Sequence, residues 1–400
     1  MKKSKLLSWP TLFLIVFLPL SAWLVSYTGN YFVALGRDIL LGLLIVVGLF
    51  NLDWRHLFTL KNLVFIAFVV WVLLSFFWRT ESLSQWLRGV RYVAEPIVLF
   101  LLLANQNNQS LKLPWKALGW MTLITLILGL AEYIFPEVFR RSLTDSLERG
   151  VMSEVHYASE YHRLQGTLAG PNAMGLFIML MLILWPIWRK SFPKVVGYTG
   201  LLAGLIALAL TFSRSSFLGL VVGIVGLIVI YWPSLAKFKK WLIPLFVIGV
   251  AAGIYLTINP PSSLARPFSG DLRVQQAKRV YRERGEIGFF GRGVGSAGLV
   301  SQNRLDEGPN YYTENTYLDM YEGMGVIGAL LYLGLWITTL VSLIRSKSPE
   351  IKIIGIAGLG LAIAGIFINH YTGQAALWYF WILAGLAVYT KDSNPLTDTV

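Results

Sequence analysis

The sequence predicts an all-α, polytopic membrane protein, and three observations lead to this fold class. Of its 400 residues, 56% are hydrophobic and only 14% are charged, a balance typical of integral membrane proteins. Apolar runs of about 17–20 residues recur along the chain, and each is long enough to cross a ~30 Å hydrocarbon core as a helix. The strands of a membrane barrel would instead alternate polar and apolar residues over about ten positions.

We predict about twelve transmembrane helices within a single membrane domain, 1–400. They lie near residues 11–28, 31–50, 62–78, 91–105, 115–135, 171–188, 195–212, 215–232, 241–258, 315–344, 352–370 and 373–390. The fourth is the weakest, because Arg91 and Glu95 lie within it. The first resembles a signal peptide, but no small-residue cleavage site follows a short core, so we expect an uncleaved span.

The distribution of basic residues favours cytoplasmic termini, an outer loop at 136–170 and a large outer loop with short helices at 259–313. The short inner loops, such as WRKSFPK and PSLAKFKK, are rich in lysine, as expected of cytoplasmic loops. With this topology, 14 lysines and 3 arginines lie inside, whereas 1 lysine and 16 arginines lie outside. Arginine presents a planar fork that grips phosphate or carboxylate at two points. The asymmetry therefore indicates an anionic ligand at the outer face of the membrane.

Other common site types find little support. The net charge of +13 does not predict nucleic-acid binding, because basic loops are usual in membrane proteins. There is no cysteine, no DxD pair, and no metal-ligand spacing among the four histidines. Gly293, Gly295 and Gly298 spell GxGxxG, but no β-α-β unit surrounds them, so we expect a flexible turn there. We therefore expect a mechanism without a metal or other cofactor.

Polar residues gather at the outer ends of the predicted spans. Arg214 lies where two spans meet, and at an outer turn it would face interfacial water and lipid phosphates. Serines 213, 215 and 216 surround it and would add hydroxyl donors. In the outer loop, Asp271 could cap a helix over 272–284. At the start of the tenth span, Thr313 could cap the helix, and Glu314 could act as a base at the membrane surface.

Four motifs, in this order, resemble the O-antigen ligase and polymerase superfamily over roughly residues 160–345. They are RLQGTLAGPNAMG at 163–175, TFSR at 211–214, the large outer loop with Arg273 and a glycine turn at 291–298, and the N-x-Y-L pattern ending in glycine at 315–325.

The resemblance implies a GT-C-like membrane glycosyltransferase. Such an enzyme takes a glycan from undecaprenyl diphosphate at the outer face of the cytoplasmic membrane and transfers it, with inversion, to an acceptor sugar hydroxyl. Neither a metal nor a nucleotide takes part. Arginines matching Arg214 and Arg273 would hold the diphosphate. Further candidates for binding the diphosphate and the glycan are Arg163, Asn172, Arg266, Asn315, Glu322 and His370.

The sequence departs from the family at one position that matters for catalysis. The family has a histidine directly before the asparagine, and this chain has Glu314. We predict that Glu314 is the base that activates the acceptor, since a carboxylate can accept a proton. The alternative is that Glu314 orients the acceptor and that His370 or Glu322 is the base.

The resemblance leaves the acceptor open. The missing histidine favours a polymerase, which extends a chain on a lipid-linked repeat unit, over a ligase, which transfers it to another glycolipid or a protein. A lipid-linked oligosaccharide transporter is a weaker alternative, because the sequence shows no internal repeat. The expected partners are the lipid-linked donor, a glycan or glycolipid acceptor and membrane lipid, with a chain-length regulator or a flippase as candidate protein partners.

Overall fold

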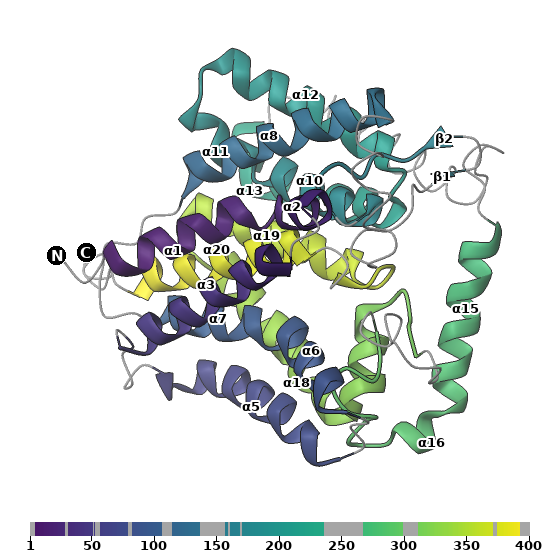
Figure 1. Ribbon diagram of the computed structural model, residues 1–400. Helices are drawn as coiled ribbons and strands as arrows, with labels where there is room; N and C mark the ends of the chain where they lie inside the picture. The colour runs from purple at the N-terminus through teal and green to yellow at the C-terminus, as the bar shows by residue number, and fades with distance from the viewer. Residues whose placement is uncertain are drawn as a thin grey trace.

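The computed structural model describes most of the chain. The described residues are 5–28, 31–50, 52, 57–78, 82–105, 114–136, 157–158, 161–168, 170–235, 267–298, 311–370 and 374–392. Within them the secondary structure is helical apart from one short hairpin, an isolated bridge between Ala297 and Tyr311 and a bridge position at Leu52 (Figure 1). The predicted all-α membrane class is therefore confirmed.

The first third of the chain forms α1 (Lys5–Phe17), α2 (Ser21–Thr28), α3 (Tyr31–Phe50), α5 (Leu60–Leu74), η1 (Ser75–Phe77), α6 (Leu83–Val93), α7 (Glu95–Ala104) and α8 (Trp115–Ile134). The middle forms β1 (Tyr157–Ala158), β2 (Tyr161–His162), α10 (Pro171–Ile183), α11 (Trp185–Trp188), η2 (Arg189–Ser191), α12 (Lys194–Thr211) and α13 (Arg214–Leu235). The last third forms α15 (Pro267–Arg282), α16 (Arg284–Ile287), α18 (Thr316–Ile344), α19 (Pro349–Ala364) and α20 (Gln374–Asp392).

Helices lie at eleven of the twelve predicted spans, and the remaining one, 241–258, lies outside the described residues. Four described helices are long and apolar enough to cross a membrane, or five if the bent pair Pro171–Ile183 and Trp185–Ser191 is one span. Shorter apolar helices lie at Ile39–Phe50, Asn62–Phe77, Glu95–Ala104 and Ala375–Val388. A total of twelve spans therefore stays a prediction.

The core is formed by α10, α19 and α20, with α7 packed along α20 and α13 packed along α19. Small residues allow α13 and α19 to approach each other closely. A Cβ atom on Gly219 would lie 2.7 Å from the carbonyl oxygen of Gly360, and one on Gly360 would lie 2.8 Å from that of Gly219. Such contacts between small residues are how helices associate where lipid removes the hydrophobic driving force.

The helix predicted over 272–284 begins earlier than the sequence indicates. α15 starts at Pro267, so Asp271 lies inside the helix and is not its N-cap. Pro at the first position suits this start, because its fixed φ is already helical and its missing N–H has no partner there anyway. In Figure 1, α15 runs across the end of the bundle that is opposite to the first turn of α1 and the last turn of α20.

The predicted span 315–344 is not one continuous helix. Gly325 has φ 68° and ψ −169°, which interrupts the helix between Met324 and Val326. We call residues 288–292 the elbow, and this turn fills the interruption. The backbone N–H of Arg292 donates to Glu322 O at 2.9 Å, and that of Val326 donates to Gly288 O at 3.3 Å. A break inside a membrane helix is tolerated where another protein segment satisfies the freed backbone groups, as the elbow does here.

Candidate functional site

The turn between α12 and α13 places Arg214 at the start of a helix. Phe212 adopts a left-handed conformation, with φ 49°, and the backbone N–H of Ser213 donates to Thr211 Oγ1 at 3.2 Å. Two residues therefore connect α12 to α13. Arg214 is the first residue of α13, and its side chain is exposed. The N–H groups of a first helical turn have no partner within the helix, so this end attracts anions.

The neighbouring serines do not act as the sequence analysis expected. Ser213, Ser215 and Ser216 are buried, and the Oγ atoms of Ser213 and Ser216 lie 2.8 Å apart in a mutual hydrogen bond. Ser213 and Ser216 pack against Gly175 of α10, where an added Cβ would lie 2.7 Å from Ser216 Oγ and 2.8 Å from Ser213 Cβ. Helix packing thus buries these two side chains beside Arg214, whose own side chain is exposed.

Arg273 and Glu314 form an ion pair beside Arg214. Both Nε and Nη2 of Arg273 lie 2.6 Å from Glu314 Oε2, and about a third of each side chain is exposed. The backbone N–H of Glu314 donates to Gln276 Oε1 at 3.1 Å, which ties this residue to α15. The charges of both members of the pair act on Arg214. The structure therefore brings the three predicted catalytic residues together from α13, from α15 and from the residue before the N-cap of α18.

A tyrosine next to this trio keeps its proton. Burial, together with the negative charges of Glu314 and Asp319, raises the pKa of Tyr312 well above its usual value, although Arg273 acts in the opposite direction. The phenol is therefore neutral throughout the physiological range and can donate a hydrogen bond.

Asn315 has a structural role that the sequence analysis gave to Thr313. It is the N-cap of α18, because its Oδ1 accepts the N–H groups of Tyr317 and Leu318 at 2.9 and 3.1 Å. The N–H and hydroxyl of Thr313 instead bond Asp319 Oδ1, at 3.0 and 2.7 Å. The cap fixes the start of α18 and, with it, the adjacent Glu314.

Arg163 and Asn172 lie next to the turn that precedes Arg214. Arg163 is buried, and its Nε donates to the carbonyl of Thr211 at 2.9 Å while Nη2 donates to Asn172 Oδ1 at 3.0 Å. These bonds satisfy a carbonyl at the end of α12 and join that end to α10. The geometry supports a positioning role for both residues. Arg266 lies outside the described residues.

Glu322 and His370, the alternative bases, are both buried. Glu322 is fully buried and pairs with Arg279 Nη2 at 2.9 Å. The His370 ring contacts Trp336, and its Nε2 lies within hydrogen-bonding distance of Leu361 O. Neither side chain is open to an acceptor in this conformation, whereas Glu314 is a third exposed.

A buried carboxylate that the sequence analysis did not single out supports the same region. Glu132, near the end of α8, places Oε1 3.0 Å from His162 Nε2, and its Oε2 accepts the N–H groups of Gln165 and Gly166 at 3.5 and 3.3 Å. The signal was present in the sequence, because an ionisable residue inside a predicted span usually has a specific partner.

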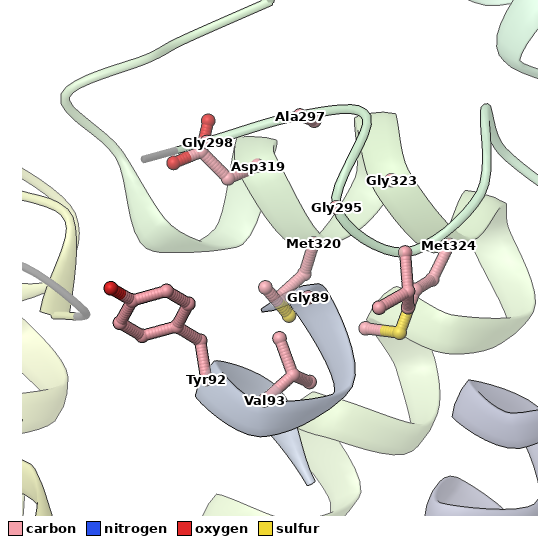
Figure 2. Close-up of a pocket in the computed structure, with 11 residues that line it drawn as sticks. Gly89, Tyr92, Val93, Gly295, Ala297, Gly298, Asp319, Met320, Gly323 and Met324 are labelled. Carbon is pink, nitrogen blue, oxygen red and sulfur yellow. The ribbon is translucent and has the colours of Figure 1, made fainter. Parts of the chain in front are cut away.

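The glycine turn is packed against the first turns of α18. Gly293, Gly295 and Gly298 all have positive φ, and Gln85 Nε2 donates to Gly295 O at 2.9 Å. A narrow pocket lies between this turn, α6 and α18. Figure 2 shows Met320 and Met324 projecting into it from α18, with Tyr92 and Val93 on α6. The expected turn is therefore present, but it is a buried and fixed one.

Metal ligands do not cluster in the described part of the chain. No group of three or more His, Asp or Glu side chains there could hold a metal ion. The charged groups of the site are instead arginines and single carboxylates.

Comparison with known families covers the segment that contains this trio. Residues 199–333 match the O-antigen ligase family. The match runs from α12 into α18 and includes Arg214, Arg273 and Glu314, so the resemblance stated from the motifs is confirmed. No curated protein matches the chain. The family match supports a membrane glycosyltransferase of the O-antigen ligase and polymerase type, whose substrates are a lipid-linked glycan and an acceptor.

Proposed function

We propose that this protein transfers a glycan from undecaprenyl diphosphate to a sugar hydroxyl at the outer face of the cytoplasmic membrane, and that it is a surface-polysaccharide polymerase. The observation that carries the proposal is the trio of Arg214, Arg273 and Glu314. Two guanidinium groups and one carboxylate, contributed by separate helical segments, match the needs of a diphosphate leaving group and a hydroxyl nucleophile.

The two arginines stabilise the leaving group. When the bond between the anomeric carbon and the diphosphate oxygen breaks, its electron pair stays on the diphosphate. Arg214 adds a fixed positive charge at the N-terminal end of α13, where the helix dipole also favours an anion. Arg273 adds a forked donor that can bind two phosphate oxygens.

Glu314 accepts the proton of the acceptor hydroxyl. That oxygen attacks the anomeric carbon from the face opposite to the diphosphate, so the configuration inverts. In the structure Arg273 donates a hydrogen bond to Glu314 Oε2, the oxygen that would accept this proton. Transfer of Arg273 from the carboxylate to the arriving diphosphate would free this oxygen, so donor binding would prepare the base. Arginine and carboxylate suffice for these steps, and the mechanism needs no metal.

The ligase is the alternative, and it differs only in the acceptor. The presence of Glu314 in place of the family histidine is the feature that favours a polymerase. A polymerase would use a second lipid-linked repeat unit as acceptor and would accept control by a chain-length regulator. A flippase would have to deliver the donor, because the lipid-linked glycan reacts at the outer face.

Purified protein in nanodiscs tests the proposal. A labelled undecaprenyl-diphosphate oligosaccharide is supplied alone, with a second lipid-linked repeat unit, or with a glycolipid acceptor of the ligase type. A polymerase lengthens the glycan in the first two mixtures, whereas a ligase labels only the third acceptor. Turnover should survive EDTA, and activity that is lost with EDTA and restored by Mg²⁺ or Mn²⁺ would exclude the metal-free mechanism. The absence of transfer in all three mixtures would contradict the proposal.

A further inference from the structure

The elbow exposes two adjacent phenylalanines. Phe289 and Phe290 are 67% and 53% exposed. They belong to the sequence GFFG, which carries no charge. Exposed aromatic pairs are unusual on a segment that faces water, because each ring left in water forfeits the free energy of burial.

The elbow is held against the end of α5. Trp78 Nε1 donates to Phe290 O at 2.9 Å, and the Trp71 ring stacks on the Phe290 ring with centroids 5.6 Å apart. Trp71 Nε1 also donates to Met324 O at 3.0 Å, next to the interruption of α18 at Gly325. The position of the elbow is therefore fixed relative to both α5 and α18.

The same end of α5 continues the exposed aromatic surface. Phe76 and Phe77 of η1 are exposed, and they lie one residue after the exposed apolar side chains Leu73 and Leu74, with the buried Ser75 between. The segment Asn62–Phe77 is predominantly apolar, as expected of a helix that faces lipid. The Trp78 ring, which follows Phe77 in the chain, contacts the Phe290 ring edge-on with centroids 5.4 Å apart, so the elbow lies at the point where this helical segment ends.

We propose that the elbow is seated in the outer interface of the lipid bilayer, with Phe289 and Phe290 inserted among the lipids at the end of the helical segment formed by α5 and η1. Aromatic side chains concentrate at this depth, where an apolar ring meets hydrated headgroups. This seating does not depend on the proposed activity. Because α16 joins the elbow to α15, the bilayer would set the height of Arg273 relative to the lipid phosphates.

The chain has no cysteine, so single cysteines can be spin-labelled without altering a background. The test compares Phe289→Cys with Glu286→Cys, whose native side chain is 70% exposed and pairs with Arg292 at 3.3 Å. Phe77→Cys is the reference for the end of α5. The labelled proteins are placed in vesicles of phosphatidylethanolamine and phosphatidylglycerol. Paramagnetic resonance then measures collisions of each label with oxygen, which enters lipid, and with a water-soluble nickel chelate.

We expect the labels at 289 and 77 to collide several-fold more with oxygen and several-fold less with the nickel chelate than the label at 286. A label at 289 that meets the chelate as often as the label at 286 would place the elbow in water and overturn the proposal. A label at 289 that is shielded from both reagents would indicate a protein contact and would also overturn it. Because the Phe289 side chain is mostly exposed, the label should not disturb folding, and the label at 77 checks that the protein is inserted.

Discussion

Replacing Glu314 with glutamine separates a catalytic carboxylate from one that only pairs with Arg273. Glutamine keeps the shape and hydrogen-bonding capacity of the side chain but cannot accept a proton. If Glu314 is the base, turnover should fall by at least ~10²-fold, the lower limit for loss of general acid–base catalysis. The acidic limb of the pH–rate profile, which reports protonation of the base, should also disappear.

The same substitution should slightly strengthen binding of the donor, although it lowers turnover. The ion pair with Arg273 is about a third exposed on both sides, so its contribution to the free energy is at most about 1 kcal/mol. Removing it releases Arg273 for the diphosphate, and KM for the donor should fall by up to about fivefold. A fall in kcat combined with an unchanged or lower KM is the expected signature. A variant that had merely lost structure would show a higher KM.

The assay is transfer of labelled glycan by the protein in nanodiscs, with kcat and KM measured for the lipid donor. Glu286→Gln is the matched control, because Glu286 is also a glutamate paired with an arginine but is 70% exposed. Glu314→His, the family's residue, should retain part of the activity. Equal turnover of the Gln variant and the unmodified protein would refute the catalytic role and leave Glu314 as a partner of Arg273 alone.

Three further predictions follow from the site and the fold. Arg214→Ala and Arg273→Ala should each reduce turnover by roughly 10²-fold in the transfer assay, and lysine should restore it only in part; near-normal alanine variants would place the diphosphate elsewhere. Gly325→Ala should lower the thermal unfolding temperature in detergent, because its Cβ would lie 2.2 Å from Phe289 O, whereas Gly285→Ala meets no atom within 4 Å and should be neutral. Cysteines introduced at positions 150 and 300 should react with an impermeant thiol reagent in intact spheroplasts. Reaction only after lysis would show that these loops face the cytoplasm and would contradict the predicted topology.

Much of the fold could be predicted because hydrophobic run length is a local property. The apolar runs recur where helices lie. Both ends of α12 and the start of α13 lie within one residue of the predicted boundaries, and α13 ends at Leu235, beyond the predicted residue 232. The interruption of α18 could not be predicted in this way. It depends on the close approach of Gly291 and Gly325, where a Cβ on Gly291 would lie 2.4 Å from Gly325 N, and no local pattern reports that contact.

In the candidate site, too, some features could be predicted from the local sequence and others depend on tertiary contacts. Arg214 was found because a charge between two apolar runs is costly to place and therefore conspicuous. The roles of the serines beside it and of Arg163 were not predictable, since they depend on the side of the turn that faces α10. Composition can indicate an arginine-rich outer face, but only packing separates arginines that hold the fold from arginines that are open to a ligand.

Two arginines of α15 differ in this respect, because the carboxylate that pairs with one is buried and the carboxylate that pairs with the other is partly exposed. Arg279 pairs with Glu322, which is fully buried, and leaving that carboxylate without its partner would cost about 3–5 kcal/mol. Arg273 pairs with Glu314, which is a third exposed, and opening that pair would cost at most about 1 kcal/mol because water replaces the lost contact. In the proposed mechanism, a bound diphosphate would therefore recruit Arg273 but not Arg279. Arg279 would keep α15 attached to α18, while Arg273, between one and two turns earlier on the same helix, would change partners.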